Sequence, residues 1–368
     1  MIHVGVDAWN LPFDRRGIGR YLRSLLDVWA DDFADRIRIS LIVPEWATWI
    51  ARRRYTDAVG RSYPVRTRAK CDRFGFDVLW FPWNGPSWTN FRTPAVATLH
   101  DAMPFELPGF DDARRATFIA AAATCRQLIA DSTYSAQALA RVLSVDRERL
   151  TAIPLGVATP ATHAQSATSG MRAPSAANWV RNDSARRVKS LGRFVLFVGE
   201  TDRRKGIDTL VTALAQVDAP RPSLVIAGRP SDPIVPVDGV TIHALGHVDN
   251  ETLAELYRQC AVFAFPSRYE GFGLPVLEAM SYGAPVVASS ATSIPEAGGD
   301  AAVYVPPDEP DALAAALTKV LRDETHAAEL RARGLARART MTWERTAEAT
   351  LRVFESAAEH ANRPAPVQ

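Results

Sequence analysis

Two glutamates, Glu270 and Glu278, stand on either side of a glycine-rich turn in the stretch SRYEGFGLPVLEAM. The turn itself suits an anion, because Gly271 and Gly273 loosen the backbone and Pro275 favours the start of a helix. The first turn of a helix presents backbone N–H groups and a positive dipole end, and both attract phosphate. A carboxylate repels a bare phosphate, but it accepts hydrogen bonds well from hydroxyl groups.

A ligand that carries phosphate between two polyols would use all of these groups. Helical side chains lean toward the helix N-terminus, so the carboxylate of Glu278 can reach back over the loop that holds Glu270. A nucleotide sugar has this constitution, with ribose on one side of the diphosphate and a hexose on the other. The alternative is that Glu278 only favours the first turns of a surface helix, and the stretch alone leaves both interpretations open.

The segments around this stretch predict a unit of a parallel sheet. Short apolar runs at residues 261–265 and 284–289 predict buried strands, and residues 275–282 between them predict a helix. Similar strands are expected at residues 3–7, 37–43, 78–81, 95–99, 127–130, 151–154, 194–198, 224–227 and 240–245. Helices are expected at residues 20–30, 113–123, 135–143, 251–259, 310–323, 327–339 and 343–360. This alternation of strands and helices indicates an α/β fold.

The length of 368 residues exceeds the size that one hydrophobic core usually serves, so two domains are expected. Between residues 158 and 192 the apolar periodicity gives way to Ala, Ser, Thr, Pro and Asn, which is typical of a linker. We expect a first doubly wound domain at residues 1–158, a mobile linker at 159–192, a second domain at 193–342, and a C-terminal helix and tail at 343–368. Ligands of such domains bind at the carboxyl ends of the strands, which places the expected site in a cleft between the domains.

The composition is that of an ordinary soluble protein, with 47% hydrophobic residues, 23% charged residues and a net charge of +2. A charge so close to balance gives no indication of nucleic-acid binding. Cys71, Cys125 and Cys260 lack the spacing of metal ligands, and they indicate reduced, buried thiols in a cytosolic protein. No apolar run reaches about 18 residues, so we expect a cytoplasmic protein with neither a membrane span nor a signal peptide.

Several motifs resemble the retaining glycosyltransferases of family 4, which have the two-domain GT-B fold. The second half carries the resemblance in FVGETDRRKGIDTL, SRYEGFGLPVLEAM and SIPEAGGDAAVYVPP, and the first half in DRRGIGRYLRSLL, VATLHDAMPF and IADSTYSAQAL. The resemblance implies two Rossmann-like α/β domains that face a cleft, with the last helix crossing back to the first domain. It also implies transfer of a hexose from a nucleotide-diphosphate sugar with retention of the anomeric configuration.

The resemblance implies roles for residues of the second half. Glu270 would contact hydroxyls of the transferred sugar, and Glu278 would hold the ribose diol. Arg204 and Lys205 would stabilise the charge on the departing diphosphate, and no metal-binding Asp-x-Asp motif stands in a fitting place. Three consecutive residues would offer backbone N–H groups to the phosphate and the sugar: Phe272, Gly273 and Leu274.

In the first half, Gly17 and Gly19 match the family's glycine loop, which closes over the donor phosphate and the acceptor. An ordinary strand-to-helix turn would show the same glycines. His100 matches the family histidine that contacts the transferred sugar, and Asp101 would orient the imidazole or the acceptor, or only cap the next turn. One departure is Glu200, because many family members have an arginine at this place.

The GIGRY, HDxxP and RK patterns resemble bacterial family members that build O-antigen or exopolysaccharide, many of them mannosyltransferases. GDP-mannose is therefore the favoured donor, UDP- and dTDP-sugars are alternatives, and the acceptor would be a saccharide or a lipid-linked saccharide. The same resemblance implies no cofactor and no metal. Among rival classes, an epimerase would bring further carboxylates, a phosphorylase a cofactor lysine or a larger chain, and a non-catalytic glycan-assembly protein would be expected to lose Lys205 or Glu270.

The stretch from Trp46 to Lys70 combines aromatic and cationic side chains. Its members are Trp46, Trp49, Ile50, Arg52, Arg53, Arg54, Arg61, Arg66, Arg68 and Lys70, opposed only by Asp57. Such a stretch suits an anionic bilayer surface, where each Lys or Arg can add about 1 kcal/mol of attraction. A peripheral position on the inner face of the plasma membrane is one interpretation. A solvated helix and loop whose arginines pair with acids elsewhere is the other.

Overall fold

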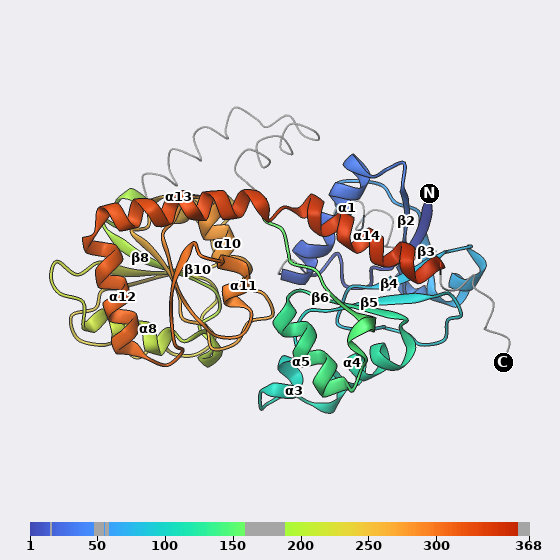
Figure 1. Cartoon of the computed structure of the whole chain (residues 1–368), viewed down its shortest axis with the longest axis horizontal. Helices are drawn as coiled ribbons and strands as arrows, with labels where there is room; N and C mark the ends of the chain where they lie inside the picture. The colour runs from blue at the N-terminus through green and yellow to red at the C-terminus, as the bar shows by residue number, and fades with distance from the viewer. Residues whose placement is uncertain (15–16, 48–54, 56–58, 159–187, 360–368) are drawn as a thin grey trace. The chain divides into compact units, whose positions relative to one another are not determined.

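The computed structural model describes residues 1–14, 17–47, 55, 59–158 and 188–359. The chain divides into two compact units: unit 1 comprises residues 1–156 and 343–368, and unit 2 comprises residues 157–342. Each unit is built on a parallel sheet with helices on both faces (Figure 1). The predicted linker lies outside the described residues except for residues 188–192.

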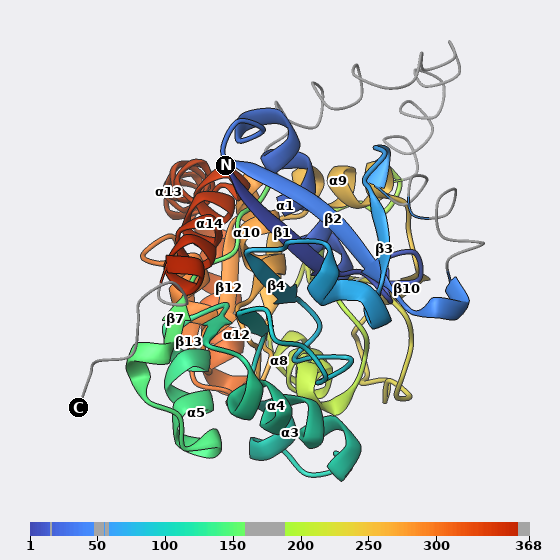
Figure 2. The ribbon, with the colours of Figure 1, turned by 90° about the vertical axis from the view of Figure 1, so that its right-hand side faces the viewer.

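The sheet of unit 1 has the strand order β3-β2-β1-β4-β5-β6-β7, and all of its strand pairs are parallel. The strands are β1 (Ile2–Asp7), β2 (Ile37–Val43), β3 (Val65–Thr67), β4 (Val78–Phe81), β5 (Ala95–Leu99), β6 (Gln127–Ala130) and β7 (Leu150–Ala152). Figure 2 shows β3, β2, β1 and β4 side by side in this order. Helices cover both faces of such a sheet, which explains why β4 and β5 are buried at every position and apolar at every position except Thr98.

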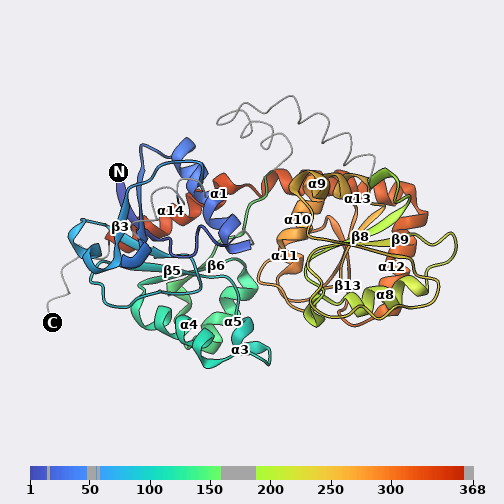
Figure 3. The same cartoon turned by 180° about the vertical axis from the view of Figure 1, so that it is seen from behind.

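Two helices from opposite ends of the chain cover one face of this sheet. Helix α1 (Gly17–Asp32) packs beside α14 (Trp343–Glu359), and the indole N–H of Trp29 donates to the carbonyl of Ala347 at 3.0 Å. The opposite face carries the remaining helices, as Figures 1 and 3 show. These are α3 (Met103–Glu106), α4 (Asp112–Thr124) and α5 (Thr133–Leu143). The last helix is therefore part of the core of unit 1.

The sheet of unit 2 has the order β10-β9-β8-β11-β12-β13 and is also parallel. Its strands are β8 (Phe194–Val198), β9 (Ser223–Ala227), β10 (Ile242–Gly246), β11 (Val262–Phe265), β12 (Val286–Ser289) and β13 (Ala302–Val305). Its longer helices are α8 (Ile207–Ala215), α9 (Asn250–Gln259), α10 (Leu274–Ser281), α12 (Pro310–Arg322) and α13 (Glu324–Thr340). Helices α8 and α12 pack together on one face, and α9 and α10 lie on the other (Figure 3).

The predicted α/β class with two doubly wound sheets is confirmed. Strands β3 and β13 and helix α8 were not predicted. Helix α8 is short and its sequence IDTLVTALA is mostly apolar, so periodicity could not separate a helix from a strand there. The three cysteines are buried and form no disulfide, in line with their expected role as reduced thiols.

Candidate active site

The candidate residues of unit 2 lie where two neighbouring strands end. Strands β8 and β11 pair at the position where the strand order of the sheet reverses. Loops that leave such a pair diverge to opposite faces, so ligands of doubly wound sheets bind at this position. The short 3-10 turn Arg203–Lys205 follows β8, and Glu270 follows β11. Sheet order thus brings together residues that are 65 positions apart in the chain.

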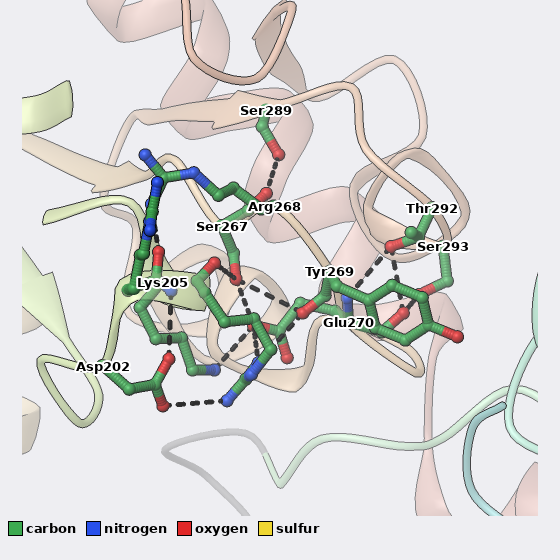
Figure 4. A network of polar contacts seen from close by, with 11 residues as sticks. Asp202, Lys205, Ser267, Arg268, Tyr269, Glu270, Ser289, Thr292 and Ser293 are labelled. Atoms are coloured by element: carbon green, nitrogen blue, oxygen red, sulfur yellow. Dashed lines mark hydrogen bonds and ion pairs between the residues drawn. The ribbon is translucent and has the colours of Figure 1, made fainter. Parts of the chain in front are cut away.

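Glu270 contacts both members of the predicted basic pair (Figure 4). Its Oε1 lies 2.6 Å from Lys205 Nζ and 3.2 Å from Arg204 Nη1, and it accepts a hydrogen bond from Ser267 Oγ at 2.5 Å. The Glu270 side chain is only 13% exposed. Burial opposes its ionisation, but Lys205 and Arg204 outweigh this effect and hold the pKa of Glu270 below its ordinary value. Glu270 is therefore a carboxylate at neutral pH.

Backbone contacts hold the basic turn against the loop that carries Glu270. The N–H of Arg268 donates to the carbonyl of Arg204 at 2.8 Å, and Asp202 caps the turn with its side chain. Gly206 ends the turn with a φ of 68°, and a Cβ at this position would lie 2.3 Å from the carbonyl oxygen of Pro266. Only glycine allows the turn to approach the end of β11 so closely.

This cluster can bind an anion and, beside it, hydroxyl groups. Two cations share one buried carboxylate, so a diphosphate would bring them further negative charge at little desolvation cost to the protein. A carboxylate relieved of part of this pairing can accept hydrogen bonds from sugar hydroxyls. The structure brings Arg204, Lys205 and Glu270 together, and their roles toward a donor remain predictions.

Helix α10 begins at Leu274, with Gly273 as its N-cap residue at a φ of 101°. Its first N–H groups have no partners within the helix, which fits the predicted use of residues 272–274 as backbone donors. Glu278 lies one turn further on and is hydrogen-bonded to α9, since the hydroxyl of the buried Tyr257 donates to Glu278 Oε2 at 3.3 Å. This contact fixes Glu278 by a route separate from the Glu270 cluster.

The predicted glycine loop of unit 1 requires a correction. Gly17 and Gly19 lie in the first turn of α1, so the predicted start of this helix at Arg20 is wrong. A Cβ at Gly19 would lie 2.0 Å from the carbonyl oxygen of Asp14, whereas the space around Gly17 is open. Close packing against the preceding segment therefore accounts for Gly19. A role of either glycine toward donor or acceptor remains a prediction.

His100 follows β5, and both of its ring nitrogens have protein partners. Nδ1 lies 2.8 Å from Asp131 Oδ2, and Nε2 lies 2.9 Å from the carbonyl oxygen of Pro82. A carbonyl only accepts hydrogen bonds, so Nε2 carries a proton. Burial disfavours the charged ring, but Asp131 outweighs it and raises the pKa of His100. To contact a sugar, the imidazole would have to exchange one of these partners.

Asp131 was not predicted as a site residue. It directly follows β6, the neighbour of β5 in the sheet, and the only sequence signal was its place in the motif IADSTYSAQAL. Asp101 was expected either to orient the imidazole or to cap a turn. Its Oδ1 accepts a hydrogen bond from the N–H of Met103 at 2.9 Å, so it caps α3, and Asp131 makes the orienting contact with His100.

We expect the stability of unit 1 to fall as the pH rises through the raised pKa of His100. The folded protein holds this proton more tightly than the unfolded chain, whose histidines keep the ordinary pKa of 6.5. The stabilisation of the folded protein by protonated His100 is therefore complete below pH 6.5, and it is lost as the pH passes the folded-state pKa of His100. Asp131→Asn should cost about 3 kcal/mol at acidic pH, because it leaves a buried imidazolium without its counter-charge.

Unfolding by denaturant between about pH 5 and 9 measures this dependence in the wild type and in His100→Asn. The difference in free energy of unfolding between the two proteins should shrink as the pH rises. A difference that is independent of pH would mean that the folded protein binds no more protons at this pair than the unfolded chain does, which would contradict the raised pKa of His100.

In the described part of the cationic stretch Trp46–Lys70, some contacts agree with pairing of the arginines to acids, and one exposed aromatic agrees with contact to a membrane. Arg61 pairs with Asp31 at 2.6 Å, and Arg68 lies 3.7 Å from the buried Asp7, as the pairing interpretation expects. Trp46, in contrast, is 64% exposed, as a membrane-facing aromatic would be. Trp49, Ile50, Arg52–Arg54 and Asp57 lie outside the described residues.

The residues that the structure describes lack two features that would point to other kinds of site. None of their helices is long and apolar enough to cross a bilayer. Nor do three or more His, Cys, Asp or Glu side chains among them gather closely enough to hold a metal ion.

Two family descriptions match this chain. Glycosyltransferase Family 4 matches residues 16–160, and Glycosyl transferases group 1 matches residues 192–323. Together they span roughly three quarters of the sequence. Each half of the chain therefore carries a glycosyltransferase region. These matches confirm the resemblance carried by the motifs, and the second matched region contains the basic pair and both glutamates.

A curated relative and two solved structures are similar to this chain. O-antigen chain mannosyltransferase B from Escherichia coli is 44% identical over 114 residues, which are 31% of this chain and 30% of the relative. The chain thus spans less than a third of that relative's length. Sucrose-phosphate synthase from Thermosynechococcus elongatus superposes with a TM-score of 0.70 at 20% identity, covering 98% of this chain and 100% of the other.

The second structure is HepE from Anabaena in complex with UDP and glucose. Its TM-score is 0.67 at 17% identity, and the superposition covers 97% of this chain and 100% of HepE. Likenesses at such identities concern the fold alone. They confirm the predicted GT-B fold.

Proposed function

We propose that this protein is a retaining glycosyltransferase that moves a hexose, mannose favoured, from a nucleotide-diphosphate sugar to a saccharide or lipid-linked acceptor. The observation that carries the proposal is the contact of Lys205 and Arg204 with Glu270 at the strand-order reversal of unit 2. The two matched glycosyltransferase regions support the reaction, and the mannosyltransferase relative supports the sugar. A structural neighbour solved with UDP and glucose supports a nucleotide-sugar donor.

In the proposed reaction, the bond between the anomeric carbon and the diphosphate oxygen breaks, and its electron pair leaves with the diphosphate. The acceptor oxygen bonds to the anomeric carbon on the same face, and its proton passes to the released diphosphate. Lys205 and Arg204 stabilise the charge on this leaving group. They are suited to this role because their side chains are only 12% and 24% exposed, so water screens them weakly.

The other predicted donor contacts follow from the same geometry. Backbone N–H groups of Phe272, Gly273 and Leu274 at the start of α10 would face the phosphate and the sugar, and Glu278 would hold the ribose diol. Glu270 would accept hydrogen bonds from hydroxyl groups of the hexose. We expect GDP-mannose to be the donor, with UDP- and dTDP-sugars as alternatives, and we expect no metal or other cofactor to be required.

Incubation with nucleotide sugars and a saccharide acceptor tests this function. Wild-type protein should release free nucleoside diphosphate from GDP-mannose, or from a UDP- or dTDP-sugar, and extend the acceptor with an α-linked sugar. A sugar-nucleotide epimerase would change the sugar without releasing the diphosphate, and a phosphorylase would release a sugar 1-phosphate from a glycan and inorganic phosphate. A non-catalytic glycan-assembly protein would leave every nucleotide sugar intact.

We also propose that the enzyme works at the cytoplasmic face of an anionic membrane, where a lipid-linked acceptor would be available. The exposed Trp46 supports this proposal, as do the cations that follow it in the sequence. We expect co-sedimentation with anionic but not neutral vesicles, and we expect it to be lost at high salt and in the triple variant with serine at 52, 53 and 54. Absence of any salt-sensitive binding to vesicles would contradict this proposal and would leave a soluble enzyme with a soluble acceptor.

A further inference from the structure

Thr292 has a backbone conformation that β-branched residues rarely adopt. It lies between β12 and the short helix α11 (Ile294–Gly298), with a φ of 51° in the left-handed region. Such a conformation persists only where the surroundings over-determine it, and residues of this kind gather at functional sites. The contacts of Thr292 indicate what this conformation secures.

The side chain of Thr292 is bonded to the backbone of Glu270 in both directions (Figure 4). The N–H of Glu270 donates to Thr292 Oγ1 at 3.0 Å, and the Thr292 hydroxyl donates to the carbonyl of Glu270 at 3.0 Å. The hydroxyl of the fully buried Ser293 donates to the same carbonyl at 2.8 Å. Both polar backbone groups of Glu270 are thus held by one neighbouring loop.

The end of β12 makes a second contact with the loop that carries Glu270. The hydroxyl of the buried Ser289, at the end of β12, donates to the carbonyl of Ser267. Ser267 in turn bonds to the Glu270 carboxylate through its own hydroxyl at 2.5 Å. The end of β12 and the loop that follows it therefore fix Glu270 at its backbone directly and at its carboxylate through Ser267.

We propose that Thr292 is a positioning residue, whose hydroxyl holds the Glu270 backbone so that the carboxylate meets Lys205 and Arg204. The contact of Glu270 with Lys205 Nζ is 2.6 Å long, so a modest rotation of the Glu270 backbone would break it. The benefit to catalysis rests on the proposed function. The hydrogen bonds by which Thr292 holds the Glu270 backbone do not depend on that function.

Thr292→Gly separates positioning from a purely structural role. Glycine adopts a positive φ without strain, and this relief offsets the loss of the Thr292 hydrogen bonds, so the melting temperature should change little. The hydroxyl is lost, so turnover should fall about tenfold or more, because a small misplacement of an active-site group has a large effect on rate. Thr292→Ser keeps the hydroxyl and should retain most of the turnover. A structural role would instead lower melting temperature and turnover together in Thr292→Gly.

Hydrogen–deuterium exchange of peptides that contain Glu270 gives a readout independent of activity. The Glu270 amide loses its acceptor in Thr292→Gly and should exchange faster, whereas it should stay protected in Thr292→Ser. Thr212→Val is a matched control in the same unit, because its hydroxyl bonds only to a carbonyl of its own helix, that of Asp208, at 3.0 Å.

These outcomes keep the inference distinct from the proposed function. Faster exchange at Glu270 with lower turnover and an unchanged melting temperature would support it. Unchanged exchange in Thr292→Gly, or faster exchange with wild-type turnover, would overturn it. If wild-type protein transfers no sugar from any donor, the proposed function fails, and the exchange result alone still decides whether Thr292 holds Glu270.

Discussion

Lys205→Ala is expected to lower turnover more than about tenfold, because the leaving diphosphate loses a direct cationic partner. The Lys205 ammonium lies 2.6 Å from Glu270 and is 12% exposed, so its charge acts with little screening by water. Release of nucleoside diphosphate at saturating donor measures the effect.

Arg203→Ala is the matched control for Lys205→Ala. Arg203 belongs to the same short turn and carries the same charge, but its side chain is exposed. This variant should keep most of the wild-type turnover. A folded Lys205→Ala protein with unchanged turnover would remove the basic pair from the reaction.

Substitutions of the two glutamates are expected to affect the binding of different ligands. Glu278→Gln should weaken binding of the free nucleoside diphosphate and of the full donor alike, by about tenfold each, because the ribose is common to both. Glu270→Gln should act mainly on the full donor, because the free diphosphate carries no hexose. It also removes the carboxylate that pairs with Lys205 and Arg204, so the free diphosphate should bind at least as well as to the wild type.

Calorimetric titration of both variants with the free diphosphate and with the donor measures this separation. Glu270→Gln leaves the largely buried Lys205 without the Glu270 carboxylate and leaves Arg204 paired with Asp202 at 3.3 Å. The loss can cost about 3 kcal/mol of stability, so binding has to be compared where both variants are folded. Equally poor binding of the free diphosphate to both variants would contradict the assignment of ribose to Glu278 and hexose to Glu270.

Much of the fold could be predicted from the sequence because the inner strands of both sheets are buried on both faces. Continuous apolar runs such as FVLFV at β8 allow few other interpretations between polar turns. The start of α1 could not be predicted, since glycines ordinarily weaken helices, and here Gly19 is required by the close approach of Asp14. Strand β3 has only three residues and provides too little pattern to recognise.

The site was predictable in its residue types but not in its contacts. Spacing around SRYEGFGLPVLEAM indicated an anion-binding turn with two carboxylates, and the family resemblance added Arg204 and Lys205. That Glu270 pairs with both cations depends on the neighbourhood of β8 and β11, which no local pattern encodes. Asp131 and Thr292 were missed for the same reason, because each acts across adjacent loops of a sheet.

The cationic stretch shows a further limit of counting charges in a sequence. Its arginines looked alike, yet Arg61 and Arg68 have acidic neighbours that lie far away in the chain. Charge density alone therefore overstated the surface that remains for an anionic membrane.

Thermal unfolding with a panel of nucleoside diphosphates tests most directly whether the Lys205–Glu270–Arg204 cluster is the donor diphosphate site. The cognate diphosphate at 100 times its Kd should stabilise the wild type by roughly 2.7 kcal/mol. Arg203→Ala should show the same stabilisation at the same concentration, and Lys205→Ala should lose most of it. A stabilisation of undiminished size in Lys205→Ala, or none in the wild type with any of GDP, UDP and dTDP, would contradict the account.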